Sequence, residues 1–347
     1  MEPITHFLTG ATLARAGFNR KTALATVTMT LAAEAADIDV VAYVKGSATG
    51  FIAHRGITHT FIGLPFVAAL SLGVVWALDA LWQRWRGKRG RPAAAKRHWG
   101  LLYLFACIAG LSHLLLDFTN NYGLRPFYPF VRQWYAWDIV FIVEPLMLAA
   151  LFAALTLPWL FGLVGQEIGV RQHGPRGRGA AIAALIFIVA LWGVRDFEHR
   201  RALAALNAVE FHGEPSTRVA AFPYMVNPFH WAGVAETSTA FVSMHVDSLR
   251  PEVDAGNTAQ SYYKPEPNEA TTAARNTRLG SAYMEWARFP LVEAEHLAAP
   301  ASGDLVRFSD VRFLYPDERR RPLEAYVLLD ALHHATWESF NPPKNQP

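Results

Sequence analysis

The sequence predicts an α-helical polytopic membrane domain followed by a small soluble α+β domain with an antiparallel sheet. The long apolar runs of the 347-residue chain all fall in residues 1–195, whereas residues 196–347 have the mixed composition of a water-soluble domain. Overall, 52% of the residues are hydrophobic and only 18% are charged, which is apolar for a soluble protein. A net charge of +3 is too small to indicate nucleic-acid binding.

The apolar runs predict about four to six membrane helices within residues 1–195. Three runs reach the length of about 20 residues that a crossing requires, namely residues 61–82, 99–118 and 139–164. A fourth run, residues 180–194, is shorter but is flanked by glycine and charge. Two weaker segments, residues 4–17 and 22–36, could form a helical hairpin around "RAGFNRK".

Basic residues predict the orientation of these helices. Loops on one side would carry 13 lysines and arginines, and those on the other side would carry 4. Because basic loops stay in the cytoplasm, we expect the second set of loops to lie outside, together with the domain that follows the last helix. The prediction is a multi-pass protein of the bacterial inner membrane with a periplasmic C-terminal domain. Its segments are a membrane domain over residues 1–195, a juxtamembrane helix and linker over 196–217, an α+β domain over 218–340 and a disordered tail over 341–347.

Candidate metal ligands fall at the outer ends of the predicted helices. They are His6, Asp37, Asp39, His54, His59, His113 and Asp117. His113 and Asp117 are four residues apart, so they share one face of a helix, and ionisable groups in an apolar run are costly and usually mark function. The only cysteine, Cys107, lies inside an apolar run. Imidazole and carboxylate without thiolate indicate one or two divalent ions, zinc foremost, with manganese or iron as alternatives.

Each candidate also has an ordinary explanation. His6 could be a polar residue near a terminus, "HRGITH" a solvated loop, and the two aspartates of "AADIDV" carboxylates at the end of a helix. Asp138 and Glu144, at the outer side of the fifth segment, could simply lie at the membrane interface. The convergence of all these residues at one membrane level favours the metal site over the separate explanations.

Four motifs resemble a known family. "THFLTGATLA", "AADIDV", "HRGITHT" and "SHLLLDFTNNYG" follow one another as in the LexA-regulated, membrane-bound, metal-dependent hydrolase family, over about residues 1–165. The resemblance implies a polytopic inner-membrane protein with a metal-dependent hydrolase site on the seven candidate ligands. The ligand set is also distantly similar to that of the zinc-dependent phospholipase C and P1 nuclease group. The HxxxE motif expected there is missing, and "WDIVFIVEP" supplies only Asp138 and Glu144.

The C-terminal domain shows strand patterns. "AFVSMHVDSL" alternates apolar and polar residues, as in a half-buried strand. We expect further strands in "SAYMEWARFP", "DLVRFSDVRFLYP" and "EAYVLLDAL", and a loop leading into a short helix in "SYYKPEPNEATTAARNT". The expected domain is a small antiparallel sheet with one or two helices, and it shows no catalytic spacing.

These observations predict an integral membrane hydrolase that cleaves a phosphoester of a lipid or lipid-linked substrate at the outer surface, through a metal-activated water. Arg55 would stabilise negative charge in the transition state, and a spare carboxylate, with Asp39 and Glu144 as candidates, would act as general base. The alternative is a non-catalytic metal-binding membrane protein, a transporter or an assembly factor, whose periplasmic domain binds a partner. A transporter should carry polar residues through to the cytoplasmic side, where only Asp79 stands out.

Overall fold

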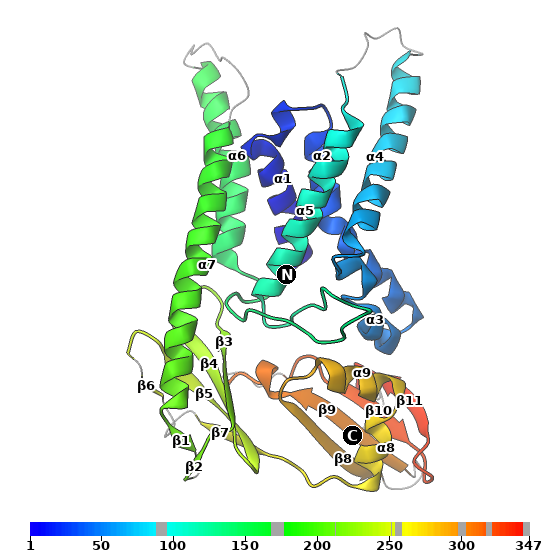
Figure 1. The fold of residues 1–347 in the computed structure, drawn as a ribbon, viewed down its shortest axis with the longest axis vertical. Coiled ribbons are helices and arrows are strands. Elements are labelled where there is room, and N and C mark those ends of the chain that lie inside the picture. Colours follow the sequence, from blue (N-terminus) through cyan, green and yellow to red (C-terminus); the bar gives the residue numbers. More distant parts are fainter. Residues whose placement is uncertain are drawn as a thin grey trace. The chain divides into compact units, whose positions relative to one another are not determined.

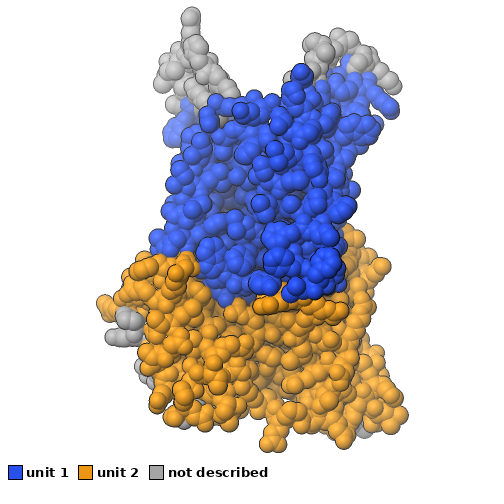
Figure 2. All heavy atoms as spheres, in the orientation of Figure 1, with its two compact units in different colours: residues 1–38, 55–131, 135–194 blue, residues 39–54, 132–134, 195–347 orange. Residues whose placement is uncertain are grey.

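The computed structural model of the chain divides into two compact units. It describes residues 1–87, 96–167, 177–211, 213–250, 252–253, 259–297, 303–316 and 321–342. The helical unit comprises residues 1–38, 55–131 and 135–194, and the sheet unit comprises residues 39–54, 132–134 and 195–347 (Figure 2). Two basic loop segments used for the predicted orientation, residues 88–95 and 168–176, lie outside the described residues, as do residues 343–347 of the expected tail.

Four long helices confirm the predicted fold class. They are α4 (Leu64–Gly87), α5 (Trp99–Thr119), α6 (Pro145–Glu167) and α7 (Arg178–Asn207) (Figure 1). Among the described residues, three helices are long and apolar enough to cross a membrane, at Leu64–Arg86, Trp99–Thr119 and Arg178–Asn207, and Pro145–Phe161 is a shorter apolar helix. The run predicted at 180–194 and the juxtamembrane helix predicted after it form one continuous helix, α7.

The start of α6 differs from the predicted start at residue 139. Residues 120–144 have no regular helix, and two isolated bridges, Asn120 to Val140 and Leu124 to Tyr135, tie this segment together. Helix α6 begins only at Pro145. Proline suits the first helical position because its missing N–H would have no partner there.

Helices α1 (Pro3–Ala16) and α2 (Ala25–Glu34) confirm the expected hairpin, with the 3-10 turn η1 (Phe18–Arg20) between them. They pack against each other and against α5 (Figure 1). With 14 and 10 residues, the two helices extend about 21 and 15 Å, which is well short of the roughly 30 Å of a bilayer core. Neither helix can therefore cross the membrane by itself.

Small residues and a few large ones fill the space between these helices. Ala14, Met29, Ala33, Leu102 and Phe105 belong to one buried cluster drawn from α1, α2 and α5. Three short elements follow α2 before α4 begins. They are η2 (Ala35–Lys45), α3 (Ser47–Ala53) and η3 (Ile57–His59).

The described residues of the sheet unit form three antiparallel sheets. In the first, the strand order is β3-β4-β5-β6, with β7 also paired to β5; in the second it is β11-β10-β9-β8; β1 and β2 form a two-stranded ribbon. The strands are β1 (Glu210–Phe211), β2 (Glu214–Pro215), β3 (Arg218–Pro223), β4 (His230–Glu236), β5 (Ala240–Asp247), β6 (Glu252–Val253), β7 (Gln260–Tyr263), β8 (Pro290–Leu297), β9 (Gly303–Asp310), β10 (Ala325–Leu329) and β11 (Ala335–Ser339). Besides α3, most of η2 and the end of α7, the described helices of this unit are α8 (Glu269–Arg275), α9 (Arg278–Trp286) and the 3-10 turn η4 (Val311–Phe313).

One strand prediction in this unit is wrong. "SAYMEWARFP" was expected to be a strand, but most of it lies in helix α9. Thr277 caps this helix by accepting a hydrogen bond from the backbone N–H of Gly280, at 3.1 Å. Leu279, Tyr283 and Trp286 are buried at helical spacing. Two other expected strands are confirmed as β5 and β10. The strand expected in "DLVRFSDVRFLYP" is confirmed as β9 only as far as Asp310, where the turn η4 follows. The expected short helix is confirmed as α8, but the loop expected before it begins with strand β7.

Candidate metal centre

Five of the seven predicted ligands meet at one end of the helical unit. His6 comes from the first half of α1, Asp37 from η2, His59 from η3, and His113 and Asp117 from the end of α5. They form two overlapping groups that could hold a metal ion, His6 with His113 and Asp117, and Asp37 with His59 and His113. The side chain of Asp37 is 17% exposed, and the other four are buried.

The two histidine Nε2 atoms lie close to each other and to one oxygen of each aspartate, at distances that suit binding to a small cation. The Nε2 atom of His59 lies 3.1 Å from Nε2 of His113, 3.2 Å from Oδ1 of Asp37 and 3.5 Å from Oδ2 of Asp117. The Nε2 atom of His113 lies 3.7 Å from Oδ1 of Asp37 and 3.5 Å from Oδ2 of Asp117. A tetrahedral zinc ion with ordinary bond lengths separates its ligand atoms by about 3.3 Å.

The hydrogen bond made by Nδ1 of His113 determines whether its Nε2 atom can bind a cation. Nδ1 of His113 lies 2.7 Å from the backbone carbonyl oxygen of Ala33. Because a carbonyl only accepts, Nδ1 carries the proton, and Nε2 of the neutral ring presents a lone pair to the cluster. That lone pair faces the ring of His59 and two carboxylates. A proton can be shared between two of these atoms only, whereas a metal ion can bind three of them, as in the group of Asp37, His59 and His113.

The ring of His6 extends the cluster. It stacks on the ring of His113 with centroids 3.8 Å apart, and its Nε2 atom lies 3.5 Å from Oδ1 of Asp117. Within the described part of the chain, neither ring nitrogen of His6 makes a hydrogen bond, although the residue is fully buried. A buried polar atom without a partner is costly, and coordination to a metal removes that cost. The donor set therefore fits a metal ion.

The pKa of Asp37 suits a metal ligand. Burial acts to raise the pKa of Asp37, but the hydrogen bond with His59 and the influence of His113 lower it to about 2. Its carboxyl group is therefore ionised at neutral pH, as a ligand must be.

Arg55 contacts a proposed ligand directly. Its Nη2 atom donates to Oδ1 of Asp117 at 2.7 Å, and its Nη1 atom donates to the carbonyl oxygen of Gly123 at 2.5 Å. The amino group of Met1 also contacts Oδ1 of Asp117. These contacts hold one oxygen of Asp117 and leave Oδ2 facing the two histidines. The guanidinium group thus lies where it positions a ligand, a role that the sequence reasoning did not assign to it.

Asn120, just after α5, is a part of the site that the sequence reasoning missed. It is fully buried, and its Oδ1 atom accepts hydrogen bonds from the backbone N–H of Tyr122 at 2.9 Å and from Nη1 of Arg55 at 3.5 Å. The guanidinium of Arg55 lies 4.7 Å from the centre of the Tyr122 ring. The consecutive "NNYG" after an HxxxD helix was the available signal, because asparagine commonly shapes turns in this way.

The remaining candidates lie outside the two metal groups. Oδ1 of Asp39 lies 3.2 Å from Nδ1 of His54, and both residues belong to the sheet unit. Glu144 is buried, and its Oε1 atom accepts a hydrogen bond from the N–H of Leu146 at 3.4 Å, at the start of α6. Asp138 is buried with a left-handed backbone, φ 61°.

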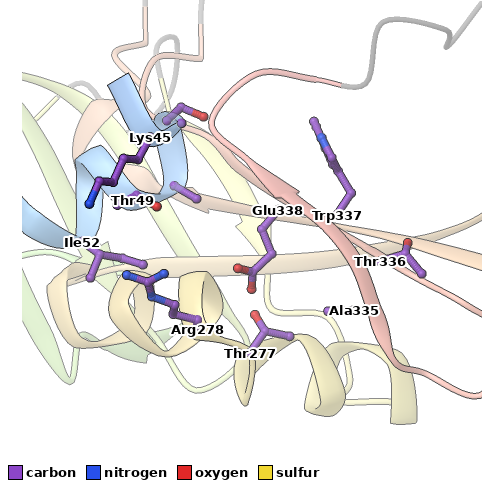
Figure 3. Close-up of a pocket in the computed structure, with 12 residues that line it drawn as sticks. Lys45, Thr49, Ile52, Thr277, Arg278, Ala335, Thr336, Trp337 and Glu338 are labelled. Carbon is purple, nitrogen blue, oxygen red and sulfur yellow. The ribbon is translucent and has the colours of Figure 1, made fainter. Parts of the chain in front are cut away.

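The sheet unit has a polar pocket of about 520 Å³ between α3, α9 and β11. Figure 3 shows Lys45, Arg278 and Glu338 on its wall. One carboxylate oxygen of Glu338 accepts a hydrogen bond from the N–H of Leu279 at 3.1 Å, in the first turn of α9. The pocket shares no residue with the metal groups of the described chain, so it is a separate feature.

Comparisons with known proteins agree with a membrane protein. The uncharacterized protein YfhP of Bacillus subtilis (strain 168) is 26% identical over 129 residues, which are 37% of this chain and 35% of that protein. No solved structure matches the chain. A family model described as YdjM inner membrane protein matches residues 1–202, a range that contains all five clustered residues, helices α4 to α6 and most of α7. Because this match covers more than half of the chain, the protein belongs to the YdjM family of multi-pass inner membrane proteins.

Proposed function

We propose that the chain is a metal-dependent hydrolase that cleaves a phosphoester of a lipid or lipid-linked substrate at the outer, periplasmic surface of the inner membrane. The observation that supports this proposal is the convergence of two histidine Nε2 atoms and two carboxylate oxygens in a buried site. Zinc is the favoured ion because the ligands are imidazole and carboxylate, and each histidine Nε2 atom lies 3.2–3.7 Å from the carboxylate oxygens. Such an ion supplies a hydroxide nucleophile at neutral pH and polarises a phosphoryl oxygen.

The charge of the site supports an anionic substrate. The side chains of Asp37, Asp117 and Arg55 together carry one net negative charge. A divalent ion changes this to one net positive charge in a largely buried place, where electrostatic attraction is much stronger than in water. A phosphodiester carries one negative charge and would be attracted to it.

Each residue has a distinct task in this proposal. Asp37, His59, His113 and Asp117 hold the ion. Arg55 fixes the orientation of Asp117 through the hydrogen bond to Oδ1. For His6, ligation of the same ion or of a second ion would account for its buried ring nitrogens, which make no hydrogen bond within the described residues.

A carboxylate outside the metal groups is the proposed general base. Asp39 and Glu144 are the carboxylates proposed for proton transfer, because neither belongs to a metal group. We expect the residue that transfers the proton to lower kcat when replaced by its amide, as Asp39→Asn or Glu144→Gln, with unchanged metal content.

The first experiment measures the metal. Purified protein, prepared in detergent without chelators, should contain at least one transition-metal ion per chain by elemental analysis. His113→Ala should lose it, because the variant removes an atom that belongs to both groups. The matched control is His230→Ala, which removes an exposed histidine from the sheet unit. Metal-free wild-type protein, or a His113→Ala variant with full metal content, would refute the proposed site.

The second experiment measures hydrolysis. Wild-type protein should release product from at least one member of a panel of phospholipids and phosphodiesters, and Asp117→Asn should not. Bound metal without hydrolysis of any panel member would favour the alternative, a non-catalytic metal-binding membrane protein with a periplasmic partner.

A third experiment tests the orientation. Cys107 is the only cysteine, so a Cys107→Ser background allows single labels. A membrane-impermeant maleimide should label Ser238→Cys, in the sheet unit, in intact spheroplasts. It should label Lys96→Cys, on the basic side, only after permeabilisation. The reverse pattern would place the metal centre and the sheet unit in the cytoplasm.

A further inference from the structure

A second pocket in the helical unit lies far from the metal centre. Its volume is about 740 Å³, and it is lined by Ala16, Gly17, Phe18, Arg20, Lys21, Leu101, Phe105 and Arg178. These residues come from the turn between α1 and α2, from α5, and from the start of α7. His6 and Ala16 stand near opposite ends of α1, about 15 Å apart along the helix axis. The pocket therefore occupies the opposite end of the unit from the metal ligands.

The lining combines an apolar wall with a cationic rim. Phe18 and Phe105 meet edge to face with ring centroids 4.8 Å apart, and Leu101 is 38% exposed. Arg20, Lys21 and Arg178 supply three positive charges, and the described lining includes no acidic residue.

The position of one rim cation is fixed by the backbone. Nε of Arg178 donates to the carbonyl oxygen of Ala16 at 3.0 Å, so this guanidinium is held at the end of α1. The bond uses one of the five N–H groups of the arginine, and the others can serve a ligand. A carbonyl at a helix C-terminus also attracts a cation, which stabilises this placement.

We propose that this pocket binds an anionic phospholipid, with an acyl chain against Phe18, Leu101 and Phe105 and the phosphate at the three cations. In a bilayer, lipid takes the place of water around the protein. Acyl chains therefore cover an apolar wall without a further cost in free energy. Cations grouped between membrane helices are the feature that selects anionic headgroups. This site is distinct from the proposed substrate site and does not depend on the proposed hydrolysis.

Bound lipid would brace the elements that carry the metal ligands. The pocket joins the ends of α1, α5 and α7. His6 lies on α1, and His113 and Asp117 lie on α5. Lipid in the pocket thus links α1 to α5 at the end opposite to their ligands.

The experiment titrates delipidated, detergent-solubilised full-length protein with phosphatidylglycerol or phosphatidylcholine and reads the bound stoichiometry by native mass spectrometry. Wild-type protein should bind phosphatidylglycerol more tightly than phosphatidylcholine. Lys21→Gln should weaken phosphatidylglycerol binding about fivefold, and Arg20→Gln with Lys21→Gln about 25-fold. Leu101→Trp, which fills the apolar part of the pocket, should weaken the binding of both lipids.

The matched control is Lys96→Gln, which removes an exposed charge from the same side of the protein but not from the pocket lining. It should leave binding unchanged. Equal affinity for the two lipids, or an equal loss in Lys96→Gln, would show that net charge alone acts and would overturn the proposal. Tight binding of glycerol phosphate, which has no acyl chain, would also overturn it. Lys21 is exposed, so its variant should fold, and an unchanged melting temperature of the delipidated protein confirms this for each variant.

Discussion

Helices α1 and α2 approach each other closely at Gly10, and we expect this contact to determine how the proposed metal ligands are placed. A Cβ atom at Gly10 would lie 2.6 Å from the carbonyl oxygen of Met29, 2.8 Å from Cβ of Ala33 and 2.9 Å from Cα of Thr30. All three distances are shorter than van der Waals contact, and two of the three atoms belong to the backbone. Gly10→Ala therefore forces the helices apart, and overpacking of this kind costs about 1–3 kcal/mol.

The same displacement should reach the metal ligands. The carbonyl oxygen of Ala33 holds Nδ1 of His113 at 2.7 Å, and Asp37 follows four residues later on the same chain segment. His6 lies one turn before Gly10 on α1. A shift of a few tenths of an ångström is enough to weaken coordination, because metal–ligand distances tolerate only about 0.2 Å. We expect Gly10→Ala to reduce metal content although it changes no ligand.

Gly73→Ala provides the matched control. A Cβ atom at Gly73, in α4, meets nothing within 4 Å. Alanine is also the better helix former by about 1 kcal/mol, so this variant should be as stable as the wild type or more stable. The assays are the apparent melting temperature in detergent and the metal stoichiometry of both variants. A Gly10→Ala variant with wild-type stability and full metal content would refute the reasoning.

Three further predictions concern single side chains. Asp37→Asn should lower the metal stoichiometry, whereas Asp39→Asn should leave it unchanged, as elemental analysis would show. Thr277→Ala should destabilise the sheet unit by about 1 kcal/mol in thermal unfolding, because it removes the cap of α9. Burial acts to raise the pKa of Glu236, but its hydrogen bond with Lys264 lowers it below the ordinary 4.5. Glu236→Gln should therefore cost about 0.5–1 kcal/mol above pH 4.5 and nothing well below it, as melting curves at several pH values would show.

The sequence predicts the long helices well because their signal is local. An apolar run of the required length is sufficient for α4 and α5, and the shorter run at residues 180–194 still predicts part of α7. The predicted start of α6 is wrong because residues 139–143 are apolar but lie in a non-helical segment, where Val140 bridges to Asn120. The error at α9 has a similar origin. Tyr283 and Trp286 favour strands by propensity, but the cap at Thr277 and the helical spacing of the buried residues decide the structure.

Only part of the ligand cluster could be predicted from the sequence. The four-residue spacing of His113 and Asp117 on a helix determines that both point to one side. The choice between Asp37 and Asp39 cannot be made in this way, because η2 is a long 3-10 segment. In the structure the first of these aspartates meets His59 and His113, and the second meets His54. The sequence predicted both aspartates as ligands because both were expected at the same level of the membrane.

Removal of the metal tests how much the proposed ion contributes to holding its ligand-bearing segments together. Three of the proposed ligands, His6, Asp37 and His59, come from a short helix and two 3-10 segments, none of which crosses a membrane alone. An ion that binds only the folded state stabilises it by about 4 kcal/mol at a thousand times its dissociation constant. Chelation should therefore increase hydrogen exchange in α1, η2 and the end of α5, and leave the strands of the sheet unit unchanged. His113→Ala should show the faster exchange without chelator and no further change with it. Equal protection in wild-type protein before and after its metal has been removed would mean that packing at Gly10 and its neighbours, without the ion, holds these segments in place.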